Sequence, residues 1–211
     1  MSLLGDVVVI VFAYFLFGLV HSLLASRKLK TIVAEKYGDY VAFYRMLYNL
    51  VSFFLFMLLL EFVPKPDIII YDLNTPFDII IFVLQIISLI FLIWSFTSFD
   101  LLEFLGIKQI IRWYNGTYSA EDLDEKGTLV TSGLYKISRH PVYLFTILFL
   151  GLRPQMDLFY LVSFVCISAY FYAGSVYEER KLLEKFGSEY AVYMKRVSRI
   201  IPFKFKWKNQ T

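Results

Sequence analysis

The sequence predicts an all-α membrane protein that crosses the bilayer about five times, from its composition, its uncharged runs and its basic residues. Apolar residues make up 58% of the 211-residue chain and mean hydropathy is +0.61, whereas soluble domains are about 45–50% apolar. Four runs carry no charge, at residues 7–25, 46–60, 79–99 and 158–177. Each approaches or reaches the ~20 residues that a helix needs to cross a membrane.

The first run is expected to be a retained span rather than a cleaved signal peptide. Asp6 is the only early charge and no small-residue cleavage site follows the run. A signal peptide starts with a basic segment and ends at such a site.

A shorter apolar segment, residues 141–152, precedes the last long run. About 12 residues are too few for an unambiguous span. However, the turn-prone segment 153–157, which contains Pro154 and Asp157, joins it to residues 158–177. We therefore expect spans four and five to form a helical hairpin.

The basic residues predict how the chain is oriented in the membrane. Five Lys and Arg lie between spans one and two, five between spans three and four, and nine after span five. Only Lys65 and Arg153 fall on the other side. The positive-inside rule then places the N-terminus outside and the long loop and C-terminus in the cytoplasm. Because these residues flank spans, no nucleic-acid partner is expected.

We expect one integral-membrane domain over residues 1–211, with no repeats. Residues 1–99 hold spans one to three, 100–140 form a cytoplasmic loop, 141–177 form the hairpin, and 178–211 form cytoplasmic helices and an anchor. The loop and the tail flank the hairpin, so the fold brings them together. We expect the ligand site there.

Motifs that bind common cofactors and metals in soluble proteins are absent from the sequence. It contains no G-x-G, Walker A, H-E-x-x-H or G-x-S-x-G. With two histidines and no close ligand spacing, no metal site is expected. Cys166 lies inside span five without an ionisable neighbour in that run, so it is interpreted as a buried apolar residue.

Arg139 and His140 stand at the start of span four. Proline disfavours a helical conformation in the preceding residue and is favoured at the first helical position, so the helix is predicted to begin at Pro141. A helix N-terminus and an arginine together suit a carboxylate or a phosphate. Alternatively, Arg139 marks the membrane interface and His140 caps the helix.

Glu178 and Glu179 follow the last span directly. Adjacent residues on a helix point about 100° apart, so one can face the bundle and the other water. An inward carboxylate at a span end can bind an ammonium group. The alternative is the solvated start of an ordinary charged helix.

The C-terminal stretch 187–202 is predicted to be a short amphipathic helix that lies on the membrane as a lid. Apolar residues recur in it at helical spacing, while Arg199 and other basic residues take other faces. The alternating aromatic and basic residues 203–208 are typical of an interfacial anchor to anionic lipid.

Together these segments resemble the membrane-embedded S-adenosylmethionine-dependent methyltransferases, which include isoprenylcysteine carboxyl methyltransferase and phospholipid methyltransferases. The resemblance covers roughly residues 128–203. Its motifs are Gly133-Leu134-Tyr135, Arg139-His140-Pro141-Val142-Tyr143, Glu178-Glu179 and Phe186-Gly187-Ser188-Glu189-Tyr190, followed by Tyr193 and Pro202.

The resemblance implies S-adenosyl-L-methionine as the cofactor and a small or lipophilic acceptor that enters from the membrane lipid. Arg139, His140 and a glutamate would hold the methionine end, and aromatic side chains would surround the adenine. Arg139 and Glu178 are the implied catalytic residues near this end. The implied cofactor-binding residues are Tyr135, Arg139, His140, Pro141, Tyr143, Glu178, Glu179 and Tyr190, with Tyr193 as a further closing residue.

The N-terminal half is similar to the methanethiol S-methyltransferase branch. The similarity rests on His21-Ser22-Leu23-Leu24-Ala25-Ser26, on Tyr44-Arg45 with Tyr48-Asn49, and on residues 98–109. This branch implies a thiol acceptor, for which a base or a positive field must favour the thiolate. His21 is the candidate catalytic base or orienting group. It can equally be a satisfied intramembrane histidine.

Other functions stay open at this stage. A prenylcysteine carboxylate or a phospholipid amine is an alternative acceptor for the same enzyme class. Two other classes are a haem or quinone protein that uses His21 and His140 as ligands, and a non-catalytic membrane scaffold. Binding of S-adenosylmethionine would separate these classes.

Overall fold

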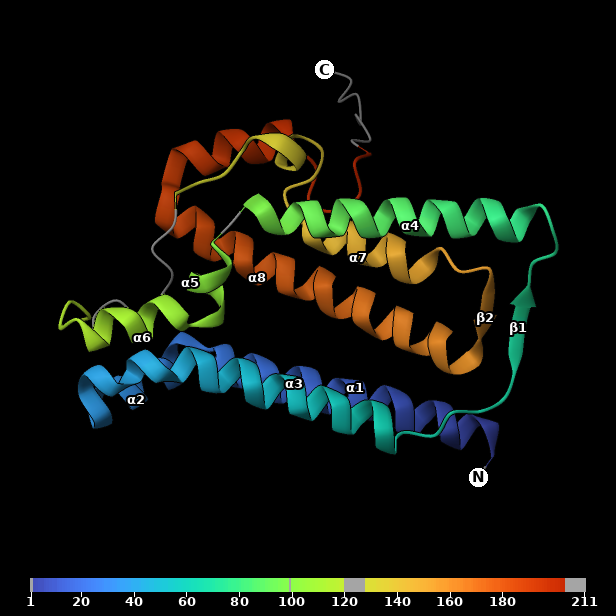
Figure 1. Cartoon of the computed structure of the whole chain (residues 1–211), viewed down its shortest axis with the longest axis horizontal. Helices are drawn as coiled ribbons and strands as arrows, with labels where there is room; N and C mark the ends of the chain where they lie inside the picture. The colour runs from blue at the N-terminus through green and yellow to red at the C-terminus, as the bar shows by residue number, and fades with distance from the viewer. Residues whose placement is uncertain (1, 99, 120–127, 204–211) are drawn as a thin grey trace, which may run out of the picture. The chain divides into compact units, whose positions relative to one another are not determined.

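The computed structural model describes residues 2–98, 100–119 and 128–203, and it is mainly helical (Figure 1). Its α-helices are α1 (Leu3–Ala25), α2 (Arg27–Tyr37), α3 (Tyr44–Phe62), α4 (Phe77–Ser95), α5 (Leu101–Leu105), α6 (Ile107–Tyr114), α7 (Pro141–Gly151) and α8 (Leu158–Arg196). Three 3₁₀ helices are η1 (Gly38–Phe43), η2 (Phe96–Ser98) and η3 (Gly133–Lys136). Strands β1 (Ile69–Asp72) and β2 (Gln155–Asp157) pair as a two-stranded sheet.

The predicted fold class is confirmed, and the small sheet is an addition that was not predicted. Among the described residues, four helical segments are long and apolar enough to cross a membrane: Leu3–Ala25, Arg27–Phe62, Phe77–Ser98 and Leu158–Arg196. The predicted span 141–152 corresponds to α7, whose 11 residues extend only about 16 Å. The chain is thus a multi-pass membrane protein, and a fifth span stays a prediction.

The described chain divides into two compact units. The first contains residues 2–71, 100–119 and 156–166, and the second contains residues 72–98, 128–155 and 167–203. Each is described by itself below.

In the first unit, α1 and α3 pack together and short helices follow at their ends. Ser26 ends α1 and caps α2, because its Oγ accepts a hydrogen bond from the Leu29 N–H at 3.4 Å. Gly106 lies between α5 and α6 with φ of +90°. A Cβ atom at this position would lie 2.7 Å from the Met46 nitrogen, so α5 can approach α3 only with glycine there.

In the second unit, α4 and α7 pack side by side. The rings of Phe91 and Phe145 stack with their centroids 5.1 Å apart, and Gln85 donates a hydrogen bond to the Phe149 carbonyl at 3.0 Å. Leu134, Leu144, Phe145 and Ile200 form a buried core beside them. This core anchors the loop before α7 and the segment after α8, and both carry candidate site residues.

Helix α8 contains one break, at Gly187, with φ of +54° and ψ of −126°. Glycine adopts this conformation without the steric penalty of a Cβ atom. The predicted helix over 187–202 is wrong at its C-terminal end, because α8 stops at Arg196 and a bent segment follows. Tyr190, Tyr193 and Ile200 are buried within the unit. Of the predicted anchor 203–208, only Phe203 lies among the described residues, and it is exposed.

Candidate functional site

The site begins with a short parallel pairing of two segments that lie far apart in the sequence. The backbone N–H of Arg139 donates to the Ser198 carbonyl at 2.9 Å, and that of His140 donates to the Arg199 carbonyl at 3.1 Å. The buried Ser138 hydroxyl also donates to the Arg199 carbonyl, at 2.9 Å. The loop before α7 and the chain after α8 are therefore fixed to each other, as expected from the sequence.

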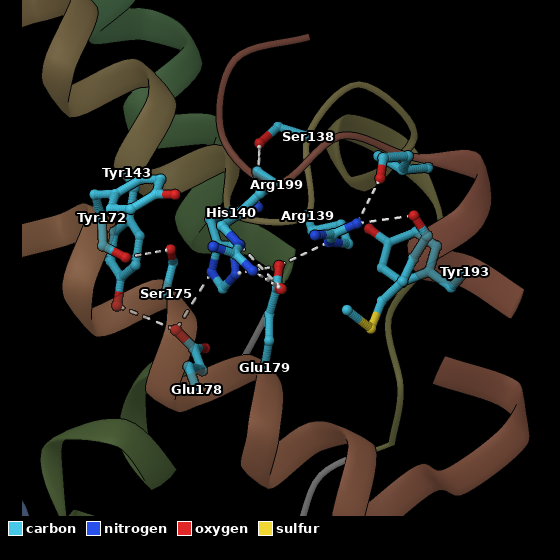
Figure 2. Close-up of polar contacts among 12 residues, drawn as sticks. Ser138, Arg139, His140, Tyr143, Tyr172, Ser175, Glu178, Glu179, Tyr193 and Arg199 are labelled. Atoms are coloured by element: carbon cyan, nitrogen blue, oxygen red, sulfur yellow. Dashed lines mark hydrogen bonds and ion pairs between the residues drawn. The ribbon is translucent and has the colours of Figure 1, made fainter. Parts of the chain in front are cut away.

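Glu179 is the centre of a buried ion-pair cluster (Figure 2). One carboxylate oxygen accepts a hydrogen bond from Arg139 Nε at 2.7 Å, and the other accepts from Arg199 Nε at 3.0 Å. His140 Nε2 lies 3.3 Å from the first oxygen. Only 3% of the Glu179 side chain is exposed. A carboxylate buried this deeply needs such partners, because burying it unpaired would cost several kcal/mol.

The Arg139 guanidinium is also used to hold the backbone. Its Nη1 donates to the carbonyls of Met194 and Val197, at 2.9 and 2.7 Å. These carbonyls belong to the end of α8 and the residue after it, where backbone acceptors have no partner within the helix. Arg139 therefore joins Glu179 to the turn that ends α8, and its side chain is 8% exposed.

Glu178 differs from its neighbour because 48% of its side chain is exposed. One carboxylate oxygen accepts a hydrogen bond from the Tyr143 hydroxyl at 3.1 Å and lies 3.3 Å from His140 Nδ1. The prediction that one glutamate faces the bundle and the other faces water is confirmed. The two ring nitrogens of His140 thus face two different carboxylates.

Three rings form a stack next to Glu178. His140 and Tyr143 are nearly parallel with ring centroids 5.2 Å apart, and Tyr143 and Phe171 are 4.6 Å apart. His140 precedes α7, whose first residue is the buried Pro141 as predicted. Tyr143 follows two residues later, while Phe171 comes from α8. The stack therefore places aromatic rings beside an exposed carboxylate.

Three further candidate tyrosines, Tyr135, Tyr190 and Tyr193, lie in the same unit. The Tyr193 hydroxyl donates to the Tyr135 carbonyl at 2.6 Å, which fixes the last part of α8 against η3. Burial, together with the nearby Glu178, raises the pKa of the Tyr135 hydroxyl, so this group stays neutral at physiological pH. Tyr190 is 1% exposed, and its hydroxyl is buried without a partner among the described residues.

His21 belongs to the first unit, whereas the other candidates belong to the second. Its Nδ1 lies 2.9 Å from Ser52 Oγ and its Nε2 lies 2.7 Å from the Tyr48 hydroxyl. The Phe17 ring stacks on the imidazole at 5.6 Å. Helix α1 supplies His21 and helix α3 supplies both hydroxyls, which are one helical turn apart.

Arg199 and Ser138 were not among the site residues predicted from the sequence. Arg199 was predicted to take a non-apolar face of a helix over 187–202, but it lies after the end of α8, where it pairs with Glu179 and its guanidinium lies 5.6 Å from the Tyr172 ring centroid. Arg199 gave no local signal because its partner is 20 residues earlier. Ser138 had a weak signal, since it precedes Arg139 in a segment that already carries the motif.

The donor set suits a ligand with an ammonium group and an aromatic ring. Glu178 offers an accessible carboxylate, and aromatic rings lie next to it. Among the described residues, the buried Tyr190 hydroxyl has no hydrogen-bond partner. These features fit the charged methionine end and the adenine of S-adenosylmethionine.

Comparison with known proteins identifies the family. A family model described as phospholipid methyltransferase matches residues 80–189. The chain is 28% identical to methanethiol S-methyltransferase 1 of Bradyrhizobium diazoefficiens over 200 residues, which cover 90% of this chain and 64% of that protein. It is 33% identical to the methanethiol S-methyltransferase of Pseudomonas deceptionensis over 100 residues, 47% of this chain and 36% of that protein.

The match spans more than half of the chain, which therefore belongs to the phospholipid methyltransferase family. This confirms the resemblance found in the sequence. The chain covers less than two thirds of the length of the relatives that it matches. No solved structure matches it.

Proposed function

We propose that this phospholipid methyltransferase family member transfers a methyl group from S-adenosyl-L-methionine to a small thiol at the membrane. The observation that carries the proposal is the accessible Glu178 carboxylate, positioned by Tyr143 and His140 beside a stack of rings. The site is built from the family's own motif residues, and they lie at the start of the apolar helix α7 and directly after the uncharged first half of α8. The relatives named as methanethiol S-methyltransferases support a thiol as acceptor.

Within the site, Glu178 is the group that receives the ammonium of the cofactor. It is the more exposed of the paired glutamates, and its bonds from Tyr143 and His140 leave acceptor positions on the carboxylate. Glu179 cannot serve equally, because Arg139 and Arg199 already occupy both its oxygens. Glu179 and Arg139 therefore act as positioning residues for His140 and for the end of α8.

The remaining candidates shape the rest of the site. Tyr143 and His140 hold Glu178 in place, Tyr135 and Tyr190 line the site, and Pro141 starts α7 so that His140 keeps its conformation. When bound, the sulfonium of the cofactor supplies an electrophilic methyl group. A dry site around it favours displacement, since positive charge disperses as the methyl group moves.

The acceptor half of the reaction needs a thiolate, which His21 would promote as a base or orienting group. The branch resemblance and the names of the relatives favour a small, membrane-permeant thiol. The nineteen-to-two partition of basic residues supports cytoplasmic placement of the long loop and C-terminus, with the N-terminus outside.

The test is methyl transfer from labelled cofactor by the purified full chain in lipid nanodiscs. The acceptors are methanethiol and longer thiols, a prenylcysteine analogue and phosphatidylethanolamine. We expect transfer to the thiols and none with Glu178→Ala. Transfer to the prenylcysteine or to the lipid alone would replace the thiol assignment. Absence of transfer together with absence of cofactor binding would overturn the enzyme proposal.

A further inference from the structure

The buried cluster around Glu179 contains more positive charge than negative charge. The guanidinium groups of Arg139 and Arg199 both pair with the single Glu179 carboxylate (Figure 2). Among the described residues, neither guanidinium forms an ion pair with Glu178. The Arg139 side chain is 8% exposed, whereas that of Arg199 is 30% exposed. The surplus positive charge is therefore most accessible to a ligand at Arg199.

The Arg199 guanidinium is held in place, and only part of its donor set is used. Nε and Nη2 lie 3.0 and 2.9 Å from the same Glu179 oxygen, and the Tyr172 ring centroid lies 5.6 Å from the guanidinium carbon. The contacts with described residues include no hydrogen bond from Nη1. A guanidinium carries five N–H donors in a fixed plane, so its remaining edge can bind a second carboxylate.

The backbone of Arg199 is fixed to the loop that carries the family motif. Its carbonyl accepts hydrogen bonds from the His140 N–H at 3.1 Å and from the Ser138 hydroxyl at 2.9 Å. The next residue, Ile200, belongs to the buried core of the unit. Arg199 is therefore already positioned before a ligand arrives, which lowers the entropy that binding costs.

An accessible carboxylate and an accessible guanidinium are connected through His140 within the second unit. Nδ1 of His140 lies 3.3 Å from a Glu178 oxygen, and Nε2 lies 3.3 Å from one oxygen of Glu179, whose other oxygen binds Arg199. An α-amino acid carries an ammonium and a carboxylate on the same carbon. It therefore needs one partner of each sign, and this cluster offers both.

We propose that Arg199 binds the α-carboxylate of the cofactor's methionine end, while Glu178 receives the ammonium. This inference rests on the proposed function, which names the cofactor and gives that carboxylate no partner. Arg139 belongs to the motif, but its Nε holds Glu179 and its Nη1 holds the carbonyls at the end of α8. Arg199 is thus the residue that contacts the carboxylate, and Arg139 is a positioning residue.

The end of α8 provides a matched control. Arg196 is the last residue of α8 and is exposed. Arg196→Gln and Arg199→Gln each remove one positive charge from the same short segment, but only the second removes a partner of Glu179. Arg139 still pairs with Glu179 in Arg199→Gln, so this variant is expected to fold. Arg199→Lys keeps the charge without the planar set of donors and serves as a second variant.

The first experiment titrates the full chain in lipid nanodiscs by calorimetry with S-adenosylhomocysteine and with its analogue lacking the α-carboxylate. Wild type and Arg196→Gln should prefer the carboxylate form by about tenfold or more, as expected for a charge-assisted bond. Arg199→Gln should bind both forms almost equally, and Arg199→Lys should keep only part of the preference. A wild type without this preference, or the full preference in either Arg199 variant, would overturn the proposal.

The second experiment uses the analogue lacking the α-amino group to separate a direct contact from general damage to the site. Arg199→Gln should keep the wild-type preference for the amino form, because Glu178 is unchanged. Glu178→Gln should in turn keep the preference for the carboxylate form. Loss of both preferences in Arg199→Gln would show a structural role and overturn the proposal.

Methyl transfer to the thiols is measured in parallel, so that the inference and the proposed function can fail separately. A wild type that shows the carboxylate preference, loses it in Arg199→Gln and methylates no thiol would support the role of Arg199 and contradict the proposed acceptor. A wild type that methylates thiols while Arg199→Gln keeps the preference would contradict the role of Arg199 alone.

Discussion

Each unit of the protein buries a glutamate against an arginine, and the two clusters differ in how they are assembled. In the first unit, Glu103 accepts two hydrogen bonds from Arg112, both at 2.8 Å, and one from Gln109 at 3.1 Å. All three residues lie within ten positions of the chain. In the second unit, the partners of Glu179 are Arg139, 40 residues earlier, and Arg199, 20 residues later.

The Glu103 cluster is a local structural contact, whereas the Glu179 cluster belongs to the candidate site. The Glu103 cluster fixes α5 against α6 within one short segment of the chain. The Glu179 cluster joins three distant segments and leaves its neighbour Glu178 with an accessible carboxylate. A buried ion pair is by itself weak evidence of function. The exposed acidic group that the pair positions is the stronger indication.

The largest expected effect is on stability when the centre of the distant cluster is neutralised. Glu179→Gln leaves the buried Arg139 guanidinium and the partly buried Arg199 guanidinium without their charge partner, which should lower the free energy of unfolding by about 3–5 kcal/mol. Denaturant unfolding in detergent measures it. Glu178→Gln is the adjacent control and should stay within about 0.5 kcal/mol of wild type. Equal effects for both variants would remove the distinction between the two glutamates.

The next effect concerns the backbone role of Arg139. Arg139→Lys keeps the charge near Glu179 but cannot reproduce the bonds to the Met194 and Val197 carbonyls. We expect a stability loss of about 1–3 kcal/mol and faster hydrogen exchange at the Arg139 and His140 amides. Arg112→Lys is the counterpart in the first unit and should leave those two amides unchanged. If amides 139 and 140 of Arg139→Lys exchange as slowly as in wild type, the bonds from Arg139 to the two carbonyls do not hold this backbone in place.

A comparable or smaller effect is expected at Glu103, and it should depend on pH. Its hydrogen bonds from Arg112 hold the pKa of the Glu103 carboxyl below the ordinary value of 4.5, although burial opposes this. The stabilisation is therefore fully present above pH 4.5 and disappears as pH falls through the lowered pKa. Glu103→Gln should cost about 1–2 kcal/mol at neutral pH.

The difference in the free energy of unfolding between wild type and Glu103→Gln should become smaller in acid. Unfolding curves at neutral pH and below pH 4.5 measure it, and cofactor affinity should not change. A gap that widens in acid would show that the carboxylate form is not what stabilises the fold.

The smallest effect is expected from Tyr143→Phe. The variant keeps the ring stack and removes one partly exposed hydrogen bond to Glu178. Affinity for S-adenosylhomocysteine should fall by about 0.5–1.5 kcal/mol, as measured by calorimetry. Tyr172→Phe on α8 is a suitable control. Among the contacts described for the site, the Tyr172 hydroxyl makes no hydrogen bond to Glu178. A loss as large as that of Glu178→Gln would assign the binding role to Tyr143.

Much of the fold followed from the sequence for simple physical reasons. Uncharged runs located the long helices, Pro141 fixed the start of α7, and helical rotation separated Glu178 from Glu179. These features depend on neighbouring residues only. The sheet was missed because β1 and β2 are short and stabilise each other across more than 80 residues.

The parts of the site that depend on distant contacts could not be predicted. Helical periodicity suggested a helix to residue 202, but Arg139 holds the carbonyls of Met194 and Val197 and the chain turns after Arg196. Because the chain turns there, Arg199 pairs with Glu179. Tyr48 and Ser52 are one turn apart on one face of α3, which was a usable signal. Their shared partner on α1 was not visible in the sequence.

The role of Glu178 can be tested most directly by asking which part of the cofactor it recognises. Wild type and Glu178→Gln are each titrated by calorimetry with S-adenosylhomocysteine and with its analogue lacking the α-amino group. Wild type should prefer the amino form by about tenfold or more, as expected for a charge-assisted bond, and Glu178→Gln should bind both forms almost equally. If Glu178→Gln keeps the wild-type preference, the ammonium is recognised elsewhere.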